Sequence, residues 1–156
     1  MNDETGFGAG PLSHAIFRVA RLHKAWAARL LSTTGLYPGQ ELVLMTLWRD
    51  GPRRQADLVH TLDSDAPTMT RSIARLEKAG LVRKETSQED RRVTIVEVTE
   101  AGLELREPVE QAWAELERLT VGSLSPRRQT EVLAALADVE RNLLDPDESA
   151  TGTGES

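Results

Sequence analysis

The sequence has 156 residues, of which 28% are charged and 39% hydrophobic, and its formal net charge is −6. This length suits one domain, and the absence of cysteine excludes disulfides, thiolate-bound zinc, iron–sulfur clusters and cysteine redox sensing. There is no run of about 20 apolar residues and no basic stretch followed by an apolar run at the N-terminus. We therefore expect a cytoplasmic protein without a membrane span or a secretory signal.

Charge is unevenly distributed along the chain. Residues 53–92 carry nine cationic and seven acidic side chains, which gives this segment a net charge of +2 within an acidic protein. Local charge governs the attraction of phosphate more than the total charge does. The segment is therefore a candidate for contact with nucleic acid, although the negative total argues against a generally adhesive nucleic-acid binder.

Both ends of the chain have compositions typical of disorder. Residues 1–10 contain three glycines and two acids, and residues 145–156 contain four acids and no basic or large apolar side chain. Such segments bury too little apolar surface to offset the entropy of ordering. We expect a disordered N-terminus and a disordered acidic tail, which either keeps the protein soluble or competes with DNA for the basic segment.

Three helices are expected in the first part of the chain. Residues 11–35 begin at a proline, repeat apolar side chains at spacings of three and four, and end at Gly35. A second helix starts at Pro38 and stops at Gly51-Pro52; it is apolar nearly all round and should be buried. A short third helix covers about residues 55–62.

The next segment has the pattern of a helix followed by a β-hairpin. Asp65 follows a tight turn and is a good N-cap for a helix over residues 66–79, which ends at Gly80. Residues 81–84 and 92–98 are strand-like, the second being rich in β-branched side chains, and a polar loop joins them. The third helix, this helix and the hairpin together describe a winged helix-turn-helix.

Two further helices are expected over residues 99–144. Thr99 caps the first, in which Pro108 should introduce a kink or shift the start, and Ser125-Pro126 begins the second. These helices and the one over residues 11–35 carry apolar stripes that a small winged helix cannot fully cover. We therefore expect them to bury each other in a dimer.

The predicted fold class is mainly α with a small β-hairpin wing. The winged helix-turn-helix DNA-binding domain covers residues 36–98, with its wing at residues 85–92. It is flanked by N- and C-terminal dimerisation helices over residues 11–35 and 99–144.

One face of the helix over residues 66–79 has the side chains expected of a surface that contacts DNA. On a helical wheel, Met69, Ile73 and Leu76 point to the core. The outward and flanking positions carry small, hydroxyl and cationic side chains: Pro67, Thr68, Thr70, Arg71, Ala74, Arg75 and Lys78. Arginine in a major groove can bind guanine O6 and N7; the alternative interpretation is an ordinary solvated helix face.

The predicted hairpin loop ends in Asp90, Arg91 and Arg92. An arginine on a hairpin tip suits a narrow minor groove, where negative potential is focused. A neighbouring carboxylate can orient a guanidinium and stiffen the loop. We therefore interpret Asp90 as a brace for the wing, an interpretation that gains its weight from the helix and strands before it.

Six short segments occur in a characteristic order between about Leu36 and Leu105. They are Tyr37-Pro38-Gly39-Gln40, Gln55-Ala56-Asp57-Leu58-Val59, Pro67-Thr68-Met69-Thr70-Arg71, Arg75-Leu76-Glu77-Lys78-Ala79-Gly80-Leu81-Val82, Asp90-Arg91-Arg92 and Val98-Thr99-Glu100-Ala101-Gly102. In this order they resemble the MarR family of bacterial transcription regulators. The resemblance implies a triangular homodimer that binds a pseudopalindromic operator, mostly as a repressor, with recognition helices in successive major grooves and wings in minor grooves.

By the same resemblance, contacts with bases and nearby phosphates fall to the first turns of the recognition helix: Ala66, Pro67, Thr68, Thr70 and Arg71. Arg75 resembles a backbone or groove-edge contact, Arg91 a phosphate contact, and Arg92 the residue that enters the minor groove. Two positions depart from the family pattern. Arg54 stands where relatives often cap the third helix with Thr or Ser, and Asp63 replaces a frequent Gly; Asp tolerates the left-handed conformation better than most residues do.

The resemblance also implies release of DNA by a small anionic or aromatic ligand, in a pocket between the dimer helices and the DNA-binding lobes. Candidate lining residues are His14, Arg18, His23, Trp26 and Trp48. Arg18 could pair with an anion while the indoles stack on a ring, although the tryptophans also fit a plain core and His23 a structural histidine.

No metal site, cofactor or enzymatic activity is predicted. His14 and His23 are nine residues apart, which places them on opposite sides of one helix, and His60 stands alone. The sequence has neither a phosphate-binding glycine loop nor a nucleophile elbow. Two alternatives stay open: a winged-helix module that binds a protein, and a regulator that acts without a ligand or as an activator.

Overall fold

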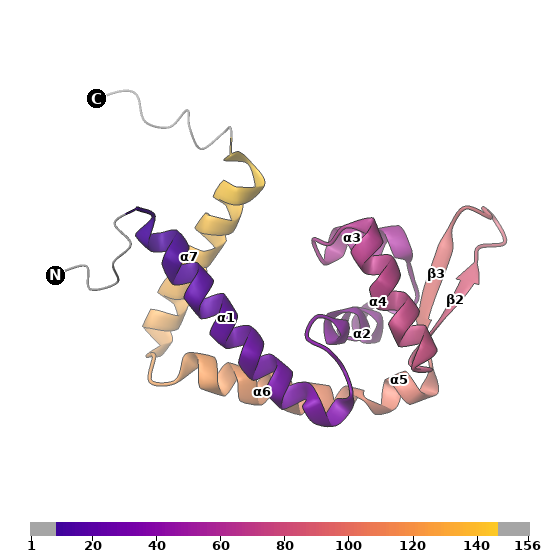
Figure 1. Ribbon diagram of the computed structural model, residues 1–156, viewed down its shortest axis with the longest axis horizontal. Coiled ribbons are helices and arrows are strands. Elements are labelled where there is room, and N and C mark those ends of the chain that lie inside the picture. The colour runs from indigo at the N-terminus through magenta and orange to yellow at the C-terminus, as the bar shows by residue number, and fades with distance from the viewer. Residues whose placement is uncertain (1–8, 147–156) are drawn as a thin grey trace. The chain divides into compact units, whose positions relative to one another are not determined.

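The computed structural model describes residues 9–146, which form two compact units that divide between Glu117 and Arg118. Most of the two ends expected to be disordered, residues 1–8 and 147–156, lie outside the described residues. In chain order the elements are α1 (Pro11–Leu31), the short 3₁₀ helix η1 (Ser32–Thr34), α2 (Gln40–Asp50), β1 (Arg53–Arg54), α3 (Gln55–Thr61), α4 (Ala66–Lys78), β2 (Val82–Thr86), β3 (Thr94–Val98), α5 (Glu100–Glu104), α6 (Arg106–Val121) and α7 (Pro126–Leu144) (Figure 1).

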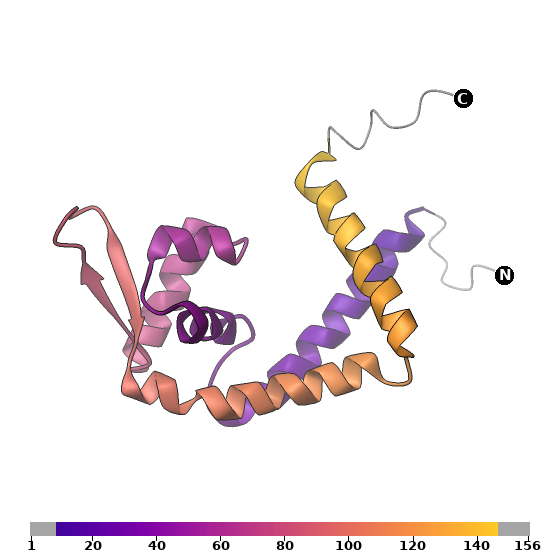
Figure 2. The ribbon, with the colours of Figure 1, turned by 180° about the vertical axis from the view of Figure 1, so that it is seen from behind.

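The predicted fold class is confirmed: the chain is mainly helical, with one small antiparallel sheet. The strand order is β1-β3-β2, and Lys84 of β2 pairs with Val96 of β3. The β2–β3 hairpin lies beside α4 at one edge of the first unit (Figure 2). The two-residue strand β1 was not predicted, because so short a segment shows no alternation of polar and apolar side chains.

The hairpin strands are shifted from their predicted bounds. β2 runs on to Thr86, and β3 begins only at Thr94. The tip of the wing is therefore residues 87–93, and Arg92 lies in the tip instead of opening a strand.

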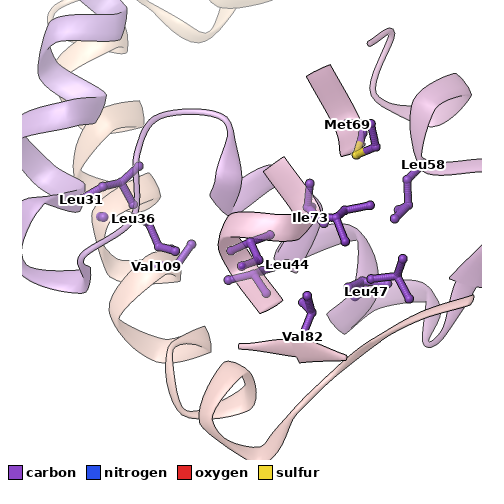
Figure 3. Close-up of a cluster of buried hydrophobic side chains, with 13 residues drawn as sticks. Leu31, Leu36, Leu44, Leu47, Leu58, Met69, Ile73, Val82 and Val109 are labelled. Carbon is purple, nitrogen blue, oxygen red and sulfur yellow. The ribbon is translucent and has the colours of Figure 1, made fainter. Parts of the chain in front are cut away.

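The core of the first unit forms around α4, as the helical wheel predicts. Met69, Ile73 and Leu76 have relative exposures of 3%, 0% and 1%. They pack in one cluster with buried side chains from α2, α3 and the sheet, which include Leu44, Leu47, Leu58, Val82 and Val96 (Figure 3). Each fully buried aliphatic side chain contributes about 1.5–3 kcal/mol of transfer free energy, so this cluster fixes which face of α4 points outward.

The helix ends confirm most of the predicted capping residues. The side chains of Asp65, Thr99 and Ser125 accept hydrogen bonds from the backbone N–H groups of α4, α5 and α7. Asp63 has φ 47°, the left-handed conformation expected of it. Arg54, which stands where relatives often have a capping Thr or Ser, precedes α3 without a side-chain cap.

The start of α2 differs from its prediction. The helix begins at Gln40, two residues after Pro38, which lies in a turn. The turn is held by side chains of the helix itself: Tyr37 N donates to Gln40 Oε1 at 3.0 Å, and Gly39 N donates to Glu41 Oε2 at 2.7 Å. Burial raises the pKa of Glu41, which is only 3% exposed.

The helix expected after Thr99 is divided into α5 and α6 at Leu105. Pro108 is the third residue of α6, where a missing backbone N–H leaves no intrahelical bond unmade. The predicted effect of Pro108, a kink or a shifted start, thus takes the form of a break before it.

Two helices leave apolar side chains uncovered. On α1 these are Leu12, Ile16, Val19, Leu22 and Trp26, which are 38–64% exposed. On α7 they include Leu133, Leu136, Leu143 and Leu144, which are 55–76% exposed, and α7 buries none of its residues. Within residues 9–146, no helix is long and apolar enough to cross a membrane.

Candidate nucleic-acid interface

The first turn of α4 is ordered by a chain of hydrogen bonds that ends on an arginine. Asp65 accepts from Thr68 N and from Thr68 Oγ1, each at 2.8 Å. Thr68 Oγ1 in turn accepts from Arg71 Nη2 at 3.5 Å. The bond from the Thr68 backbone, more than any other cause, lowers the pKa of Asp65, so the carboxylate stays charged and orients both side chains.

Thr70 has a second set of contacts. Its hydroxyl donates to Ala66 O at 2.8 Å and accepts from Gln55 Nε2 at 3.0 Å. Gln55 is the first residue of α3, so this bond joins the start of α3 to the recognition helix. This role of Gln55 was not predicted from the sequence.

The predicted contact residues of α4 lie on its solvent side. Ala66, Pro67, Thr68, Thr70, Arg71 and Arg75 are all exposed. Since Met69, Ile73 and Leu76 fill the core, the exposed face presents small, hydroxyl and cationic groups together. This composition fits a major groove, where small side chains permit close approach.

The wing supports the interpretation of Asp90. Asp90 Oδ1 accepts from the backbone N of Arg92 at 3.0 Å and from its Nε at 3.3 Å. The Arg92 side chain is nevertheless 91% exposed. The guanidinium is thus oriented from one side and open on the others, and Arg91 beside it is also exposed.

Glu77 connects the recognition helix to the wing. Its Oε2 accepts from Lys84 N at 3.3 Å, and its Oε1 lies 3.6 Å from Lys84 Nζ. A second ion pair, Arg83 Nε to Glu97 Oε2 at 3.1 Å, crosses from β2 to β3. These contacts relate the helix and the hairpin to each other, and the sequence analysis did not find them.

Comparison with known proteins agrees with this geometry. The model of the MarR family matches residues 36–94, from before α2 to the start of β3. YwoH of Bacillus subtilis, an uncharacterized HTH-type transcriptional regulator, is 38% identical over 90 residues, which are 58% of this chain and 66% of the relative. The chain belongs to the MarR family.

Two further similar proteins match over more of the chain. The HTH-type transcriptional repressor NicR of Pseudomonas putida is 28% identical over 139 residues, which are 89% of this chain and 85% of NicR. The solved structure of reduced AbfR bound to DNA is 28% identical with a TM-score of 0.71, over 85% of this chain and 91% of that one. Members of the MarR family are transcriptional regulators and not enzymes, in agreement with the sequence analysis.

The first unit of this MarR-family chain also has a pocket of about 460 Å³ formed by α2, the end of α3 and the start of α6. Trp48 lines it, with its Nε1 donating to Gly102 O at 3.2 Å. Other lining residues that the sequence analysis missed are Met45, Arg49, Arg106, Glu110 and Trp113. Trp113 Nε1 is buried and has no hydrogen-bond partner in the described part of the chain.

The other candidate ligand residues are not brought to this pocket. His14, Arg18, His23 and Trp26 all belong to α1, and none of them lines it. Trp26 lies under the guanidinium of Arg29, whose Cζ is 4.5 Å from the ring centroid. Among residues 9–146, no group of three or more His, Cys, Asp or Glu side chains could hold a metal ion.

Proposed function

We propose that the protein is a cytoplasmic, homodimeric repressor that binds a pseudopalindromic DNA operator. In each protomer α4 enters a major groove and the wing enters the adjacent minor groove. The base and phosphate contacts proposed for α4 are Ala66, Pro67, Thr68, Thr70 and Arg71, with Arg75 at the groove edge. In the wing, Arg92 enters the minor groove, Asp90 orients it, and Arg91 contacts a phosphate.

The observation that carries this proposal is the pair of oriented, exposed arginines. Arg71 is held through Thr68 and Asp65, and Arg92 through Asp90. Fixing a long side chain before binding reduces the entropy lost on binding. A protein-binding winged helix has no comparable need for one oriented guanidinium on the helix and another on the wing.

The proposal of a dimer is supported by the uncovered apolar side chains of α1 and α7. Monomeric soluble proteins rarely expose large contiguous apolar patches. A second copy of the chain offers the same helices in return, which is how twofold interfaces are built. Two recognition helices one duplex turn apart then match a pseudopalindrome.

The test is a mobility-shift titration of the full chain with DNA from upstream of its own gene. We expect specific binding that Arg71→Ala and Arg92→Ala each weaken by about 1–3 kcal/mol, or about 5- to 150-fold. The matched control is Arg49→Ala: this exposed arginine belongs to α2, outside α4 and the wing, and is paired with Asp50 at 2.8 Å, so its loss should leave the affinity of the ligand-free protein unchanged. Equal affinities for all four proteins would contradict the proposal.

A second candidate function is release by an aromatic acid bound in the pocket of α2, α3 and α6. Its volume lies within the range of small-molecule sites, the indoles and Met45 offer apolar contact, and Arg49 and Arg106 offer positive charge. The buried Trp113 Nε1 is a donor without an acceptor, which such a ligand would supply.

Thermal-shift and operator-release assays with a panel of aromatic carboxylic acids test this. At least one acid should raise the unfolding temperature and lower operator affinity, and Trp113→Phe should weaken both effects because it removes the donor together with part of the aromatic surface. A panel without any effect would leave a ligand-independent regulator.

A further inference from the structure

A crevice of about 350 Å³ lies between the start of α4 and the wing. It is lined by Arg54, Gln55, Ala56, Asp57, Val59, Ala66, Arg92, Val93 and Thr94. These residues come from β1, α3, α4, the wing tip and β3. The crevice thus lies between the two elements that the proposed function places in neighbouring grooves.

The position of the crevice determines which part of a bound duplex it faces. A major and a minor groove are separated by one sugar-phosphate strand. If α4 lies in the first groove and the wing in the second, this strand must pass over the surface between them. The part of the protein that faces its phosphates is the crevice.

Arg54 and Arg53 differ in what they face, although they are adjacent in β1. Successive side chains of a strand point to opposite sides. Arg53 Nε lies 4.0 Å from Asp50 Oδ2, and Arg53 Nη1 donates to Pro52 O at 3.3 Å. Arg54 instead lines the crevice, is exposed, and forms no ion pair within residues 9–146.

Gln55 supplies an oriented donor to the same crevice. Its Nε2 donates one hydrogen to Thr70 Oγ1 at 3.0 Å, and a primary amide nitrogen has a second hydrogen to donate. The Thr70 hydroxyl accepts because its own hydrogen is given to Ala66 O. The amide is therefore held by the recognition helix itself. Asp57 is the one acid that lines the crevice, against two arginines.

We propose that this crevice binds one phosphate of the DNA strand that runs between the two grooves. The Arg54 guanidinium and the second Nε2 hydrogen of Gln55 are its donors. The bond from Gln55 to Thr70 makes the position of the phosphate depend on the position of α4. The inference rests on the proposed function and adds to it a phosphate site, held by two residues that the base-contact surface does not include.

The experiment uses the full chain and its operator, mapped by footprinting, with single methylphosphonates that remove the charge of one phosphate at a time. For the unmodified protein we expect one position in each half-site where the neutral linkage weakens binding about tenfold. Arg54→Ala should weaken binding to the natural duplex by a similar factor, on operator and unrelated DNA alike, because phosphates carry no sequence. At the position where the neutral linkage weakens binding of the unmodified protein, the same linkage should cause little further loss of affinity in Arg54→Ala.

Salt dependence provides a second readout. Removal of one cation–phosphate contact from each protomer should make the negative slope of log K against log salt shallower by about 1.8 for the dimer. Gln55→Met keeps the length of the side chain and removes the amide, so it should weaken binding several-fold with the slope unchanged. In the Thr70→Val background, which lacks the hydroxyl that holds the amide, Gln55→Met should cost less than it does alone.

The neighbouring Arg53→Ala is the matched control and should keep both the affinity and the slope. If Arg54→Ala and Gln55→Met behave like this control while the chain binds its operator, the crevice proposal is wrong and the proposed function stands. If the unmodified chain binds no duplex, both are wrong.

Discussion

The helices α1 and α4 are both amphipathic, but they differ in how far their apolar side chains are buried. α4 buries Met69, Ile73 and Leu76 within its own chain. α1 buries only Ala27 and Leu31, near its C-terminal end, and leaves Val19 and Leu22 more than half exposed. The exposed face of α4, which we propose contacts DNA, is therefore set by a single chain, whereas the apolar stripe of α1 needs a second surface to cover it.

The largest effect is expected when a charged side chain is introduced into the apolar stripe of α1. Val19→Glu places a carboxylate in the apolar stripe and should convert the dimer to a monomer in sedimentation velocity. Since the two half-sites would then be bound independently, operator affinity should fall by about 100-fold or more. Arg21→Glu, on the opposite side of α1 by helical spacing, is the control and should stay dimeric. A dimeric Val19→Glu protein would show that α1 is covered in another way.

The matching change on α4 should act on folding instead of assembly. Ile73 is completely buried, so Ile73→Ala should lower the free energy of unfolding by about 2–5 kcal/mol. The neighbouring Ala74 is exposed, and Ala74→Ser should cost about 0.5 kcal/mol or less. Urea denaturation measures both. Similar losses for the two variants would mean that α4 is not anchored in the core as described.

The sequence predicted those structural features that depend on residues close together in the chain. The caps at Asp65, Thr99 and Ser125, the left-handed Asp63 and the core face of α4 are set within a few positions of the chain. The contacts of Asp90 with Arg92 span two residues and were also anticipated. In each of these cases side-chain chemistry at a short, fixed spacing determines the geometry.

Features formed by residues distant in sequence could not be predicted in this way. Gln55 and Thr70 are 15 positions apart, and the bond from Trp48 to Gly102 spans 54. Nothing local distinguishes Arg54 from Arg53 until pairing of β1 with β3 gives their side chains different surroundings. The pocket at Trp113 likewise exists only once α6 packs against α2.

A smaller effect separates two acids of the wing. Asp90 accepts two hydrogen bonds from Arg92, whereas no side-chain contact of Glu89 is present in the described part of the chain. Asp90→Ala should weaken operator binding by about 0.5–1.5 kcal/mol, because Arg92 must then be ordered on binding. Glu89→Ala should strengthen it slightly, since it only removes a repulsion from phosphate. Equal shifts of the same sign in an anisotropy titration would contradict the proposed role of Asp90.

The smallest effect concerns the dependence of α4 on pH. The bonds from Thr68 lower the pKa of Asp65 in the folded chain below its value in the unfolded chain. A carboxyl group with a depressed folded pKa contributes stability above its unfolded pKa and loses that contribution as the pH falls through the folded value. The stabilisation by this cap should therefore be complete near pH 7 and decline below about pH 5.

Asp65→Asn isolates this contribution, because asparagine also caps helices but does not titrate in this range. The difference in unfolding free energy between the two proteins should favour the natural chain at neutral pH and shrink as the pH is lowered. All other acids are common to both proteins, so their titration cancels in the difference. A difference that stays constant from pH 7 to pH 3 would mean that the charge of Asp65 does not stabilise the start of α4, and Arg71 would then be oriented by the neutral hydrogen bonds alone.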